Sequence, residues 1–327
     1  MAELRYNPVL RDWTMVASNR QRRPDMPADW CPFCPGSGKV PDHYDVLTYD
    51  NDFPVLSPDP EAVNQPSAAL YQAREAYGKC EVILYSSDHE AALSRLGPEQ
   101  LERVVHLWRE RYTALSDNPT HQYVLLFENR GREVGATIAH PHGQIYAYPF
   151  LPIKIRTEIE SAEQHYQSTG RCLFCDITAA ECTDGTRLIA RNDRFAAYIP
   201  YFTDFPFGVW ISSTAHRPDL RRMDAEDEAA LADMIGQVTK GMDALYDREF
   251  PYMMVFHQTP VHQPETEAYY HFHIEFYPPL RAKDRVKFLS SSETGAGAAA
   301  NPAVVEETAP LLREAIRKVC HQQGATE

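Results

Sequence analysis

Positive charge is scarce in this chain of 327 residues, because 32 Lys and Arg residues stand against 46 Asp and Glu residues, a formal net charge of −14. A general nucleic-acid binder normally shows the opposite balance, since phosphate contacts need Lys and Arg. The same deficit argues against a polybasic protein of membrane surfaces. A small anionic substrate remains compatible with the composition, because a local group of Arg, Lys and His side chains can bind it.

Long hydrophobic runs are also absent. No window approaches 18 uninterrupted apolar residues, so we expect no transmembrane helix. The first thirty residues contain no apolar run, because Met1–Tyr6 is polar and Arg20, Arg22 and Arg23 interrupt the next stretch. This pattern argues against a signal peptide and predicts a cytoplasmic protein. The length corresponds to about two domains.

Cysteine is limited to seven residues, but four of them form two C-x-x-C pairs, at 31–34 and 172–175. In a chain without a secretion signal, such pairs favour metal ligands or redox centres over disulfides.

The chain repeats itself, with four motifs in the same order in each half. The first half contains C-P-F-C at 31–34, Y-D-N-D-F at 49–53, S-S-D-H at 86–89 and H-P-H-G-Q at 140–144. The second half contains C-L-F-C at 172–175, A-R-N-D-R-F at 190–195, S-S-T-A-H at 212–216 and H-F-H-I-E at 271–275. This order predicts a tandem duplication, with units at 1–150 and 151–327.

The secondary structure is expected to follow the same repeat. Helical spacing of apolar residues predicts one main helix per half, after Pro98 and after a cap at Asp224. Short strands are predicted at 81–85, 123–127, 145–148, 209–212, 252–256 and 274–277. Each half is therefore expected to be an α+β unit, an antiparallel sheet with a helix packed against it. We also expect a polar helix at 158–167, a mobile loop at 290–301 and a terminal helix at 311–319.

Each cysteine pair is followed by two spaced histidines, which suggests a closed metal site in each half. Zinc in a structural role favours thiolate and imidazole ligands in a tetrahedral shell. The plainer alternative is that these are buried free cysteines. The predicted ligand sets, for two zinc ions per chain, are Cys31, Cys34, His89 and His140, and Cys172, Cys175, His216 and His271.

Other interpretations of these residues are weaker. A thioredoxin-like redox pair should open a helix in a βαβ unit, whereas both pairs precede Pro or loop-like segments. A nucleic-acid zinc finger places its Cys and His ligands about 12 residues apart, and here the interval is much longer. A site for iron or zinc is also conceivable and would compete with the second Cys₂His₂ set. Its residues would be Glu158, His257, His273 and Glu275, although a His beside a carboxylate is more often an ordinary hydrogen-bonded pair.

The H-P-H-G-Q segment has the features of a nucleophilic site. Pro141 stiffens the chain between two histidines, so a metal-bound His140 would leave His142 rigidly aimed. A neutral imidazole is a competent nucleophile at phosphorus near pH 7. Gly143 is expected to let a ligand approach the backbone, and Gln144 can donate to an anionic oxygen.

The second copy of this segment is expected to be structural. It has Ile274 and Glu275 where the first has Gly143 and Gln144, and a carboxylate would repel a phosphate. If both copies were structural, the chain would be a zinc-stabilised binding module without catalysis, but the retained Gly143 and Gln144 argue against that.

Together these motifs resemble the histidine-triad superfamily and, more narrowly, the galactose-1-phosphate uridylyltransferase family. The resemblance spans nearly the whole chain. Besides the motifs above it includes Arg5–Pro8, Asn19–Pro24, Phe150–Pro152 and H-F-H-I-E-F-Y-P-P-L at 271–280. It implies double displacement, in which His142 takes UMP from UDP-glucose and passes it to galactose-1-phosphate while Gln144 holds the phosphoryl oxygens.

The resemblance also implies binding residues and a homodimer that completes the site. The family's positions match Asn129 and Thr137 for phosphate, Asn51 and Asp52 for the nucleoside, Phe33 and Val40 for the base, Arg20 and Arg23 near the phosphates, and Lys287 and Glu293 for the sugar phosphate. Structural alternatives remain open: a turn cap at Asn51 and Asp52, surface charge at the two arginines, and a solvated Lys–Glu pair.

The predicted sugar loop departs from the family. Ser292 stands at the aromatic position, and the segment Ser290–Ala296 has no aligned Gln. The paired C-x-x-C pattern also resembles a branch that includes plant ADP-glucose phosphorylase. The alternative function is therefore a related nucleotidyltransferase, phosphorylase or hydrolase that acts on ADP-glucose or another nucleoside diphosphate-sugar.

Overall fold

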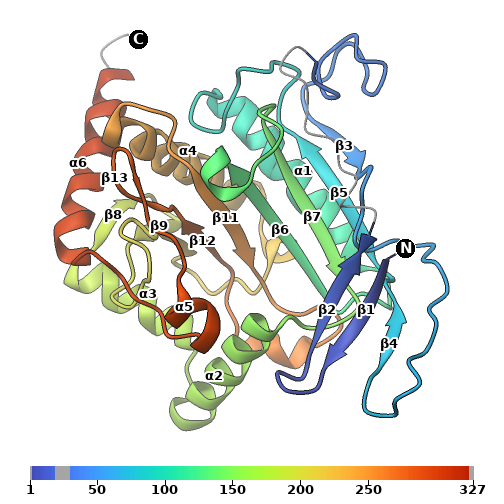
Figure 1. Ribbon diagram of the computed structural model, residues 1–327. Helices are drawn as coiled ribbons and strands as arrows, with labels where there is room; N and C mark the ends of the chain where they lie inside the picture. Colours follow the sequence, from blue (N-terminus) through green and yellow to red (C-terminus); the bar gives the residue numbers. More distant parts are fainter. Residues whose placement is uncertain (1, 19–29, 324–327) are drawn as a thin grey trace.

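The computed structural model describes residues 2–18 and 30–323, and its centre is a nine-stranded sheet (Figure 1). Every pairing in this sheet is antiparallel. In spatial order the strands are β3 (Leu47–Asp50), β5 (Lys79–Leu84), β7 (His142–Tyr148), β6 (Tyr123–Arg130), β11 (Tyr252–His257), β12 (His273–Tyr277), β10 (Trp210–Ser213), β9 (Phe195–Tyr198) and β8 (Leu188–Arg191).

The two halves share this one sheet. The first half supplies β3, β5, β7 and β6, and the second half supplies the other five strands. The strands join where β6 pairs with β11, for example Arg130 opposite Tyr252 and Glu128 opposite Met254. The duplicated α+β architecture is confirmed, and the repeats are fused edge to edge.

Helices α1 (Pro98–Ser116) and α4 (Ala225–Tyr246) pack on one face of the sheet, behind it in Figure 1. Both begin where the sequence predicts. Pro98 starts α1, and the Asp224 side chain accepts the Asp227 N–H in a capping box at the start of α4. Their apolar stripes and the inward side chains of both halves form one large core.

The opposite face is covered by α2 (Ile153–Thr169), α3 (Leu173–Asp184) and a three-stranded sheet. The small sheet has the order β2 (Asp12–Ala17), β1 (Ala2–Asn7), β4 (Ala73–Glu75). The helix predicted at 158–167 is thus confirmed as the longer α2, which ends at Gly170 in the left-handed conformation (φ 70°). The remaining elements are β13 (Leu280–Ala282), β14 (Arg285–Val286) and the 3₁₀ turns η2 (Arg132–Val134), η3 (Leu220–Arg222) and η4 (Pro264–Ala268).

Two local predictions need correction. The expected loop at 290–301 contains a short helix, α5 (Ser291–Ala296), because Ser290 and Glu293 form a capping box. The second cysteine pair does open a helix, since Cys172 is the N-cap of α3. The element before α3 is α2, however, so this is not the βαβ unit of a thioredoxin-like site.

The C-terminal segment forms α6 (Val305–Gln323), which extends the helix predicted at 311–319 in both directions and packs on α4. Among the described residues, no helix combines the length and apolar character needed to cross a membrane.

Candidate active site and metal-binding clusters

The structure brings Cys31, Cys34, His89 and His140 together, with one possible ligand atom from each within 4.8 Å of the others. The Cys34 Sγ lies 3.3 Å from Nδ1 of His89 and 3.7 Å from Nδ1 of His140. The four residues come from the N-terminal turns, the loop after β5 and the loop before β7. A shared ion would therefore tie together segments far apart in the sequence.

Hydrogen bonds at the far side of the ring orient His140 in this cluster. Its Nε2–H donates to the carbonyl oxygen of Ser86 at 2.8 Å, which turns Nδ1 toward the thiols. Such outer hydrogen bonds fix the tautomer and the direction of metal-binding imidazoles. Burial lowers the pKa of His140 to about 4, so the ring is neutral, the form that a metal ion binds.

The second set, Cys172, Cys175, His216 and His271, is assembled in the same way. The Cys175 Sγ lies 3.3 Å from Nδ1 of His216 and 3.2 Å from Nδ1 of His271. Outer partners again hold the rings, since His216 Nε2 contacts the Glu267 carbonyl oxygen at 2.7 Å and His271 Nε2 contacts the Ser213 hydroxyl at 2.7 Å. Both clusters can hold a metal ion.

The thiol chemistry of the second cluster is consistent with metal binding. The hydrogen bond from the Cys175 thiol, with those from His216 and His271, outweighs burial and holds the pKa of Cys172 far below its usual range. The same hydrogen bond, with burial, raises the pKa of Cys175 far above its usual range, so the pair holds one thiolate and one thiol. The thiolate is the form of cysteine that binds metals.

A third polar group contains Glu158, His257 and His273, also within 4.8 Å of one another. The structure assembles this group and the second Cys₂His₂ set at the same time, so the formation of one does not exclude the other, contrary to the expectation. The group is already connected internally, since His257 Nδ1 lies 2.8 Å from Glu158 and His273 Nε2 lies 3.2 Å from Glu275. Lys154 Nζ also contacts Glu275 at 2.6 Å. This arrangement matches the hydrogen-bonded His–carboxylate alternative.

The nucleophile candidate His142 is held by the backbone of its own motif. Its Nδ1–H donates to the carbonyl oxygen of His140 at 2.7 Å. In that tautomer the lone pair lies on Nε2, at the opposite edge of the ring. The Phe33 ring lies 5.9 Å from the His142 ring and 6.0 Å from the His140 ring, between centroids. The Cys₂His₂ group and His142 therefore pack around the same Phe33 ring.

Gly143 has a different role from the one predicted. A Cβ at this position would lie 2.3 Å from the Tyr85 hydroxyl oxygen and 3.3 Å from the Phe127 carbonyl oxygen. The protein's own Tyr85 phenol, rather than a ligand, fills the space beside the backbone. Gly143 is needed because β7 packs closely over Tyr85.

Gln144 follows His142 by two residues on β7, so both side chains lie on the same face of the sheet. The Tyr146 hydroxyl donates to Oε1 of Gln144 at 3.2 Å, which directs the amide NH₂ as the donor group. The strand register pairs Gln144 with Phe127, and its continuation by two residues places Asn129 opposite His142. Two neutral amides thus lie on the face that carries His142.

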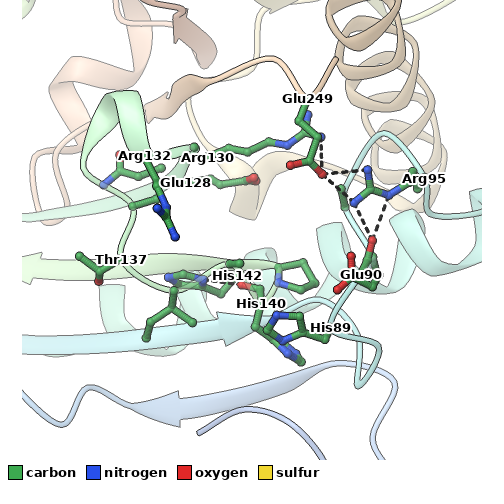
Figure 2. Close-up of a pocket in the computed structure, with 18 of the residues that line it drawn as sticks. His89, Glu90, Arg95, Glu128, Arg130, Arg132, Thr137, His140, His142 and Glu249 are labelled. Atoms are coloured by element: carbon green, nitrogen blue, oxygen red, sulfur yellow. Dashed lines mark hydrogen bonds and ion pairs between the residues drawn. The ribbon is translucent and has the colours of Figure 1, made fainter. Parts of the chain in front are cut away.

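A pocket of roughly 480 Å³ lies where β6 ends and β7 begins, and His142, Asn129 and Thr137 line it, whereas Gln144 is outside its lining (Figure 2). Figure 2 places Thr137 and His142 together, with Glu249, Arg95 and Glu90 linked at another end of the pocket. The pocket also has four arginines that the motifs did not identify, because an arginine outside a motif has no recognisable spacing: Arg95, Arg130, Arg132 and Arg248.

The predicted nucleoside residues lie on the β3 and β5 side of His142, outside the lining of this pocket. Phe33 and Val40 are buried in a small apolar cluster with Val82 and Leu84. Asn51 caps a turn, which is the structural alternative to nucleoside binding, because its Oδ1 accepts the Phe53 N–H at 2.9 Å. Asp52 accepts from the Tyr49 hydroxyl at 2.9 Å and lies 3.6 Å from Lys39.

Lys287 and Glu293 do not line the His142 pocket of their own chain. Lys287 is buried, and its Nζ donates to the Asp204 carbonyl oxygen at 2.8 Å and lies 4.6 Å from the Phe205 ring centroid. Glu293 lies 4.0 Å from Nζ and caps α5. Arg20 and Arg23 fall outside the described residues.

Comparisons with known proteins agree with this arrangement. The family models for galactose-1-phosphate uridyl transferase match residues 1–152 (N-terminal domain) and 158–322 (C-terminal domain). The galactose-1-phosphate uridylyltransferase of Thermotoga maritima is 39% identical over 96% of this chain and 98% of its own length. That of Haemophilus influenzae is 30% identical over 88% and 87%.

Solved structures give the same result. A uridylyltransferase structure that is 29% identical superposes with a TM-score of 0.89 over 97% of this chain and 99% of its own. An ADP-glucose phosphorylase from Arabidopsis thaliana shares the fold, with a TM-score of 0.74 and 22% identity over 96% and 98% of the two chains. The chain therefore belongs to the galactose-1-phosphate uridylyltransferase family.

Proposed function

We propose that this protein transfers UMP from UDP-glucose to galactose-1-phosphate through a covalent intermediate on His142. The observation that carries the proposal is the hydrogen bond from His142 Nδ1–H to the His140 carbonyl oxygen, which puts the imidazole lone pair on Nε2 of a residue that lines a pocket. Family membership and the activity for which the relatives are named support the substrate pair.

The proposed reaction has two displacements at phosphorus. In the first, Nε2 attacks the α-phosphorus of UDP-glucose, the bond to the bridging oxygen breaks, and glucose-1-phosphate leaves with the electron pair. In the second, a phosphate oxygen of galactose-1-phosphate attacks the same phosphorus, and the P–N bond breaks to restore neutral His142. The amides of Gln144 and Asn129 would donate to the phosphoryl oxygens, a positioning role that carries much of phosphoryl-transfer catalysis.

The assigned binding residues and units remain part of this proposal. Phe33, Val40, Asn51 and Asp52 would bind the nucleoside, Thr137, Arg20 and Arg23 the phosphates, and Lys287 and Glu293 the sugar phosphate. The repeat at 1–150 would carry the nucleophile and the repeat at 151–327 would complete the fold. Because Lys287 and Glu293 do not line the pocket of their own chain, their role would require a homodimer. Size-exclusion chromatography with light scattering measures the mass of the particle and tests this.

We further propose that both Cys₂His₂ clusters hold zinc, whose tetrahedral preference and affinity for thiolate and imidazole match the donors. The ion would fix His140 and, through its carbonyl oxygen, the tautomer of His142. Elemental analysis should find two zinc ions per chain in the parent and one in each of Cys31→Ser and Cys172→Ser. Two full zinc sites in both variants would contradict the assignment.

A second candidate is a related transferase, phosphorylase or hydrolase that uses ADP-glucose. The observation in its favour is the second Cys₂His₂ cluster, because the paired C-x-x-C pattern resembles the branch that includes plant ADP-glucose phosphorylase. The sugar loop, where Ser292 replaces the family's aromatic residue, bears on the hexose. The decision between uracil and adenine is therefore a matter for direct measurement.

The test is intact-protein mass spectrometry after brief exposure to UDP-glucose, with ADP-glucose in a parallel sample. We expect a mass increment of one UMP that disappears when galactose-1-phosphate is added, and no increment in His142→Ala. An increment of one AMP from ADP-glucose alone would move the assignment to the second candidate. No increment and no released nucleotide from either donor would refute both.

A further inference from the structure

Three of the four arginines that line the His142 pocket are neutralised by carboxylates. Arg95 contacts Glu249 at 3.0 Å. Arg130 pairs with Asp243 at 2.8 Å and lies largely buried, and Arg248 pairs with Glu133 at 2.7 Å. These ion pairs build the wall of the pocket, so their charges are not available at full strength to a ligand.

Arg132 differs from the other three. Its side chain is exposed, and within residues 2–18 and 30–323 its guanidinium forms no hydrogen bond or ion pair. In a chain with a net charge of −14, this is a cation in the nucleophile's pocket without a carboxylate partner in the described part of the protein. In Figure 2 Arg132 is drawn on the same side of the view as Thr137, and the Arg95–Glu249 pair on the opposite side.

The backbone that carries Arg132 is a tight, anchored turn. Gly131 has a φ of 94°, and a Cβ there would lie 2.7 Å from Pro251, so the turn begins pressed against the second half of the chain. The Gly135 N–H donates to the Arg132 carbonyl oxygen at 3.0 Å, and the ion pair of Glu133 with Arg248 holds the next residue. The turn therefore presents the Arg132 side chain from a fixed position.

The sheet order indicates which part of a nucleotide would meet this arginine. The proposed nucleoside residues lie on the β3 and β5 side of β7, and η2 follows β6 on its other side. A nucleoside diphosphate-sugar whose α-phosphorus lies at His142 would therefore direct its second phosphate away from β3, toward Arg132. Lys287, the other residue assigned to that phosphate, does not line this pocket in its own chain, so it could reach the phosphate only from a partner subunit.

We propose that Arg132 binds the phosphate that stays with the sugar, in the departing hexose-1-phosphate and in the one that enters. This inference rests on the proposed function. When the bridging bond to the α-phosphorus breaks, the departing phosphate gains negative charge, and a planar guanidinium can donate two parallel hydrogen bonds to its oxygens. Arg132 is thus a substrate-binding residue specific for the second phosphate, whereas Gln144 and Asn129 act on the transferred one.

The test compares a nucleotide with one phosphate against a nucleotide with two. In a His142→Ala background, which blocks transfer, calorimetry measures the dissociation constants of UMP and UDP, with AMP and ADP in parallel. Arg132→Ala should weaken UDP binding about tenfold, the usual scale for one charged hydrogen-bonded contact, and leave UMP within about twofold. Arg132→Lys keeps the charge without the planar fork, so it should lie between the two.

Arg317→Ala is the matched control, because it removes an exposed arginine on α6, outside the pocket lining, with the same change in net charge. It should leave both dissociation constants unchanged. Equal weakening of UMP and UDP by Arg132→Ala, or no weakening of either, would overturn the inference. If the protein binds adenine nucleotides instead of uracil nucleotides, Arg132→Ala should weaken ADP binding and leave AMP binding unchanged by the same factors. If the His142→Ala protein with Arg132 intact binds none of the four nucleotides, the inference and the proposed function fail together. That result is distinguishable, because it appears before any substitution of Arg132.

Discussion

The two H-x-H segments have the same backbone arrangement and opposite surroundings. His142 donates through Nδ1 to the carbonyl oxygen of His140 at 2.7 Å, and His273 does the same to His271 at 3.0 Å. Both lie on the same face of one sheet, but His142 lines a pocket, whereas His273 is fully buried. The Phe174 and Trp210 rings stack against His273 with centroids 4.7 and 4.5 Å away.

The neighbouring polar groups differ in charge. The register places Gln144 and Asn129 near His142, and it places Glu275 and His257 at the corresponding positions near His273. Amide donors suit a phosphate, whereas the Glu275 carboxylate binds His273 Nε2 at 3.2 Å and Lys154 at 2.6 Å. The comparison teaches that the H-x-H backbone only aims the ring; access and local charge decide whether it can react.

The largest effect should come from His142→Ala. The variant loses the nucleophile but little packing, so we expect transfer to fall by at least about a thousandfold while the thermal midpoint stays within a few degrees. Steady-state transfer and thermal unfolding measure the two quantities.

His273→Ala is its matched partner and should give the reverse result. Removal of a fully buried ring should cost about 2–4 kcal/mol of unfolding free energy, while the activity per folded molecule stays within about threefold. Loss of transfer in a folded His273→Ala protein would break the division between an active and a structural repeat.

The next effect tests the charges directly. Gln144→Glu gives the first repeat the carboxylate of the second, and repulsion of the phosphoryl oxygens should lower kcat about 100-fold or more. The reciprocal Glu275→Gln should leave kcat nearly unchanged, although it weakens the contacts with Lys154 and His273. Similar losses in both variants would mean that local charge does not distinguish the repeats.

Gly143→Ala sharpens the comparison through packing, because the second repeat has Ile274 at this position. The new Cβ would meet the Tyr85 hydroxyl, so we expect a loss of up to about 3 kcal/mol in unfolding free energy, together with reduced transfer. Denaturant unfolding should show that Tyr85→Phe recovers part of this loss in the double variant. Additive effects of the two substitutions would rule out the contact as the cause.

The smallest predicted effect concerns pH. Burial raises the pKa of Glu128 to about 7, while Phe256 takes the corresponding position in the second repeat. The unfolded chain loses this proton near pH 4.5 and the folded chain near pH 7, so the group's contribution makes the protein less stable as pH rises between these values. Glu128→Gln removes the proton change and should gain about 2 kcal/mol relative to the parent between pH 5 and pH 8.

Denaturant unfolding at both pH values measures that difference, with Glu102→Gln on the exposed side of α1 as the control. The control should show no relative gain. An equal pH dependence in the parent and Glu128→Gln would show that Glu128 is ionised in the folded protein across this range.

Much of the fold could be predicted because its signals are local and duplicated. The spacing of apolar residues gives α1 and α4, and the repeated order of Cys and His motifs correctly predicts which residues cluster, down to Cys34 with His89 and Cys175 with His216. The pairing of β6 with β11 could not be predicted, because the sequence of an edge strand does not indicate which other strand it pairs with.

The site was harder to predict where a role depends on a third residue. Tyr85 fills the space beside Gly143, and Asp204 holds Lys287, but neither partner is near in sequence. Arg132 has no motif of its own, and only the pocket reveals it. The sequence suggests Glu158, His257, His273 and Glu275 as one group, but only three-dimensional placement shows that this group and the Cys172 cluster exist side by side.

The most direct test of the account is to locate the nucleotide on the protein. After brief exposure to UDP-glucose at mildly alkaline pH, where a phosphoramidate survives, peptide mass mapping assigns the modified residue. We predict a single UMP group on the peptide that contains His142 and none on the peptide that contains His273. A nucleotide on His273, or on any residue other than His142, would contradict the claim that the first repeat alone carries the chemistry.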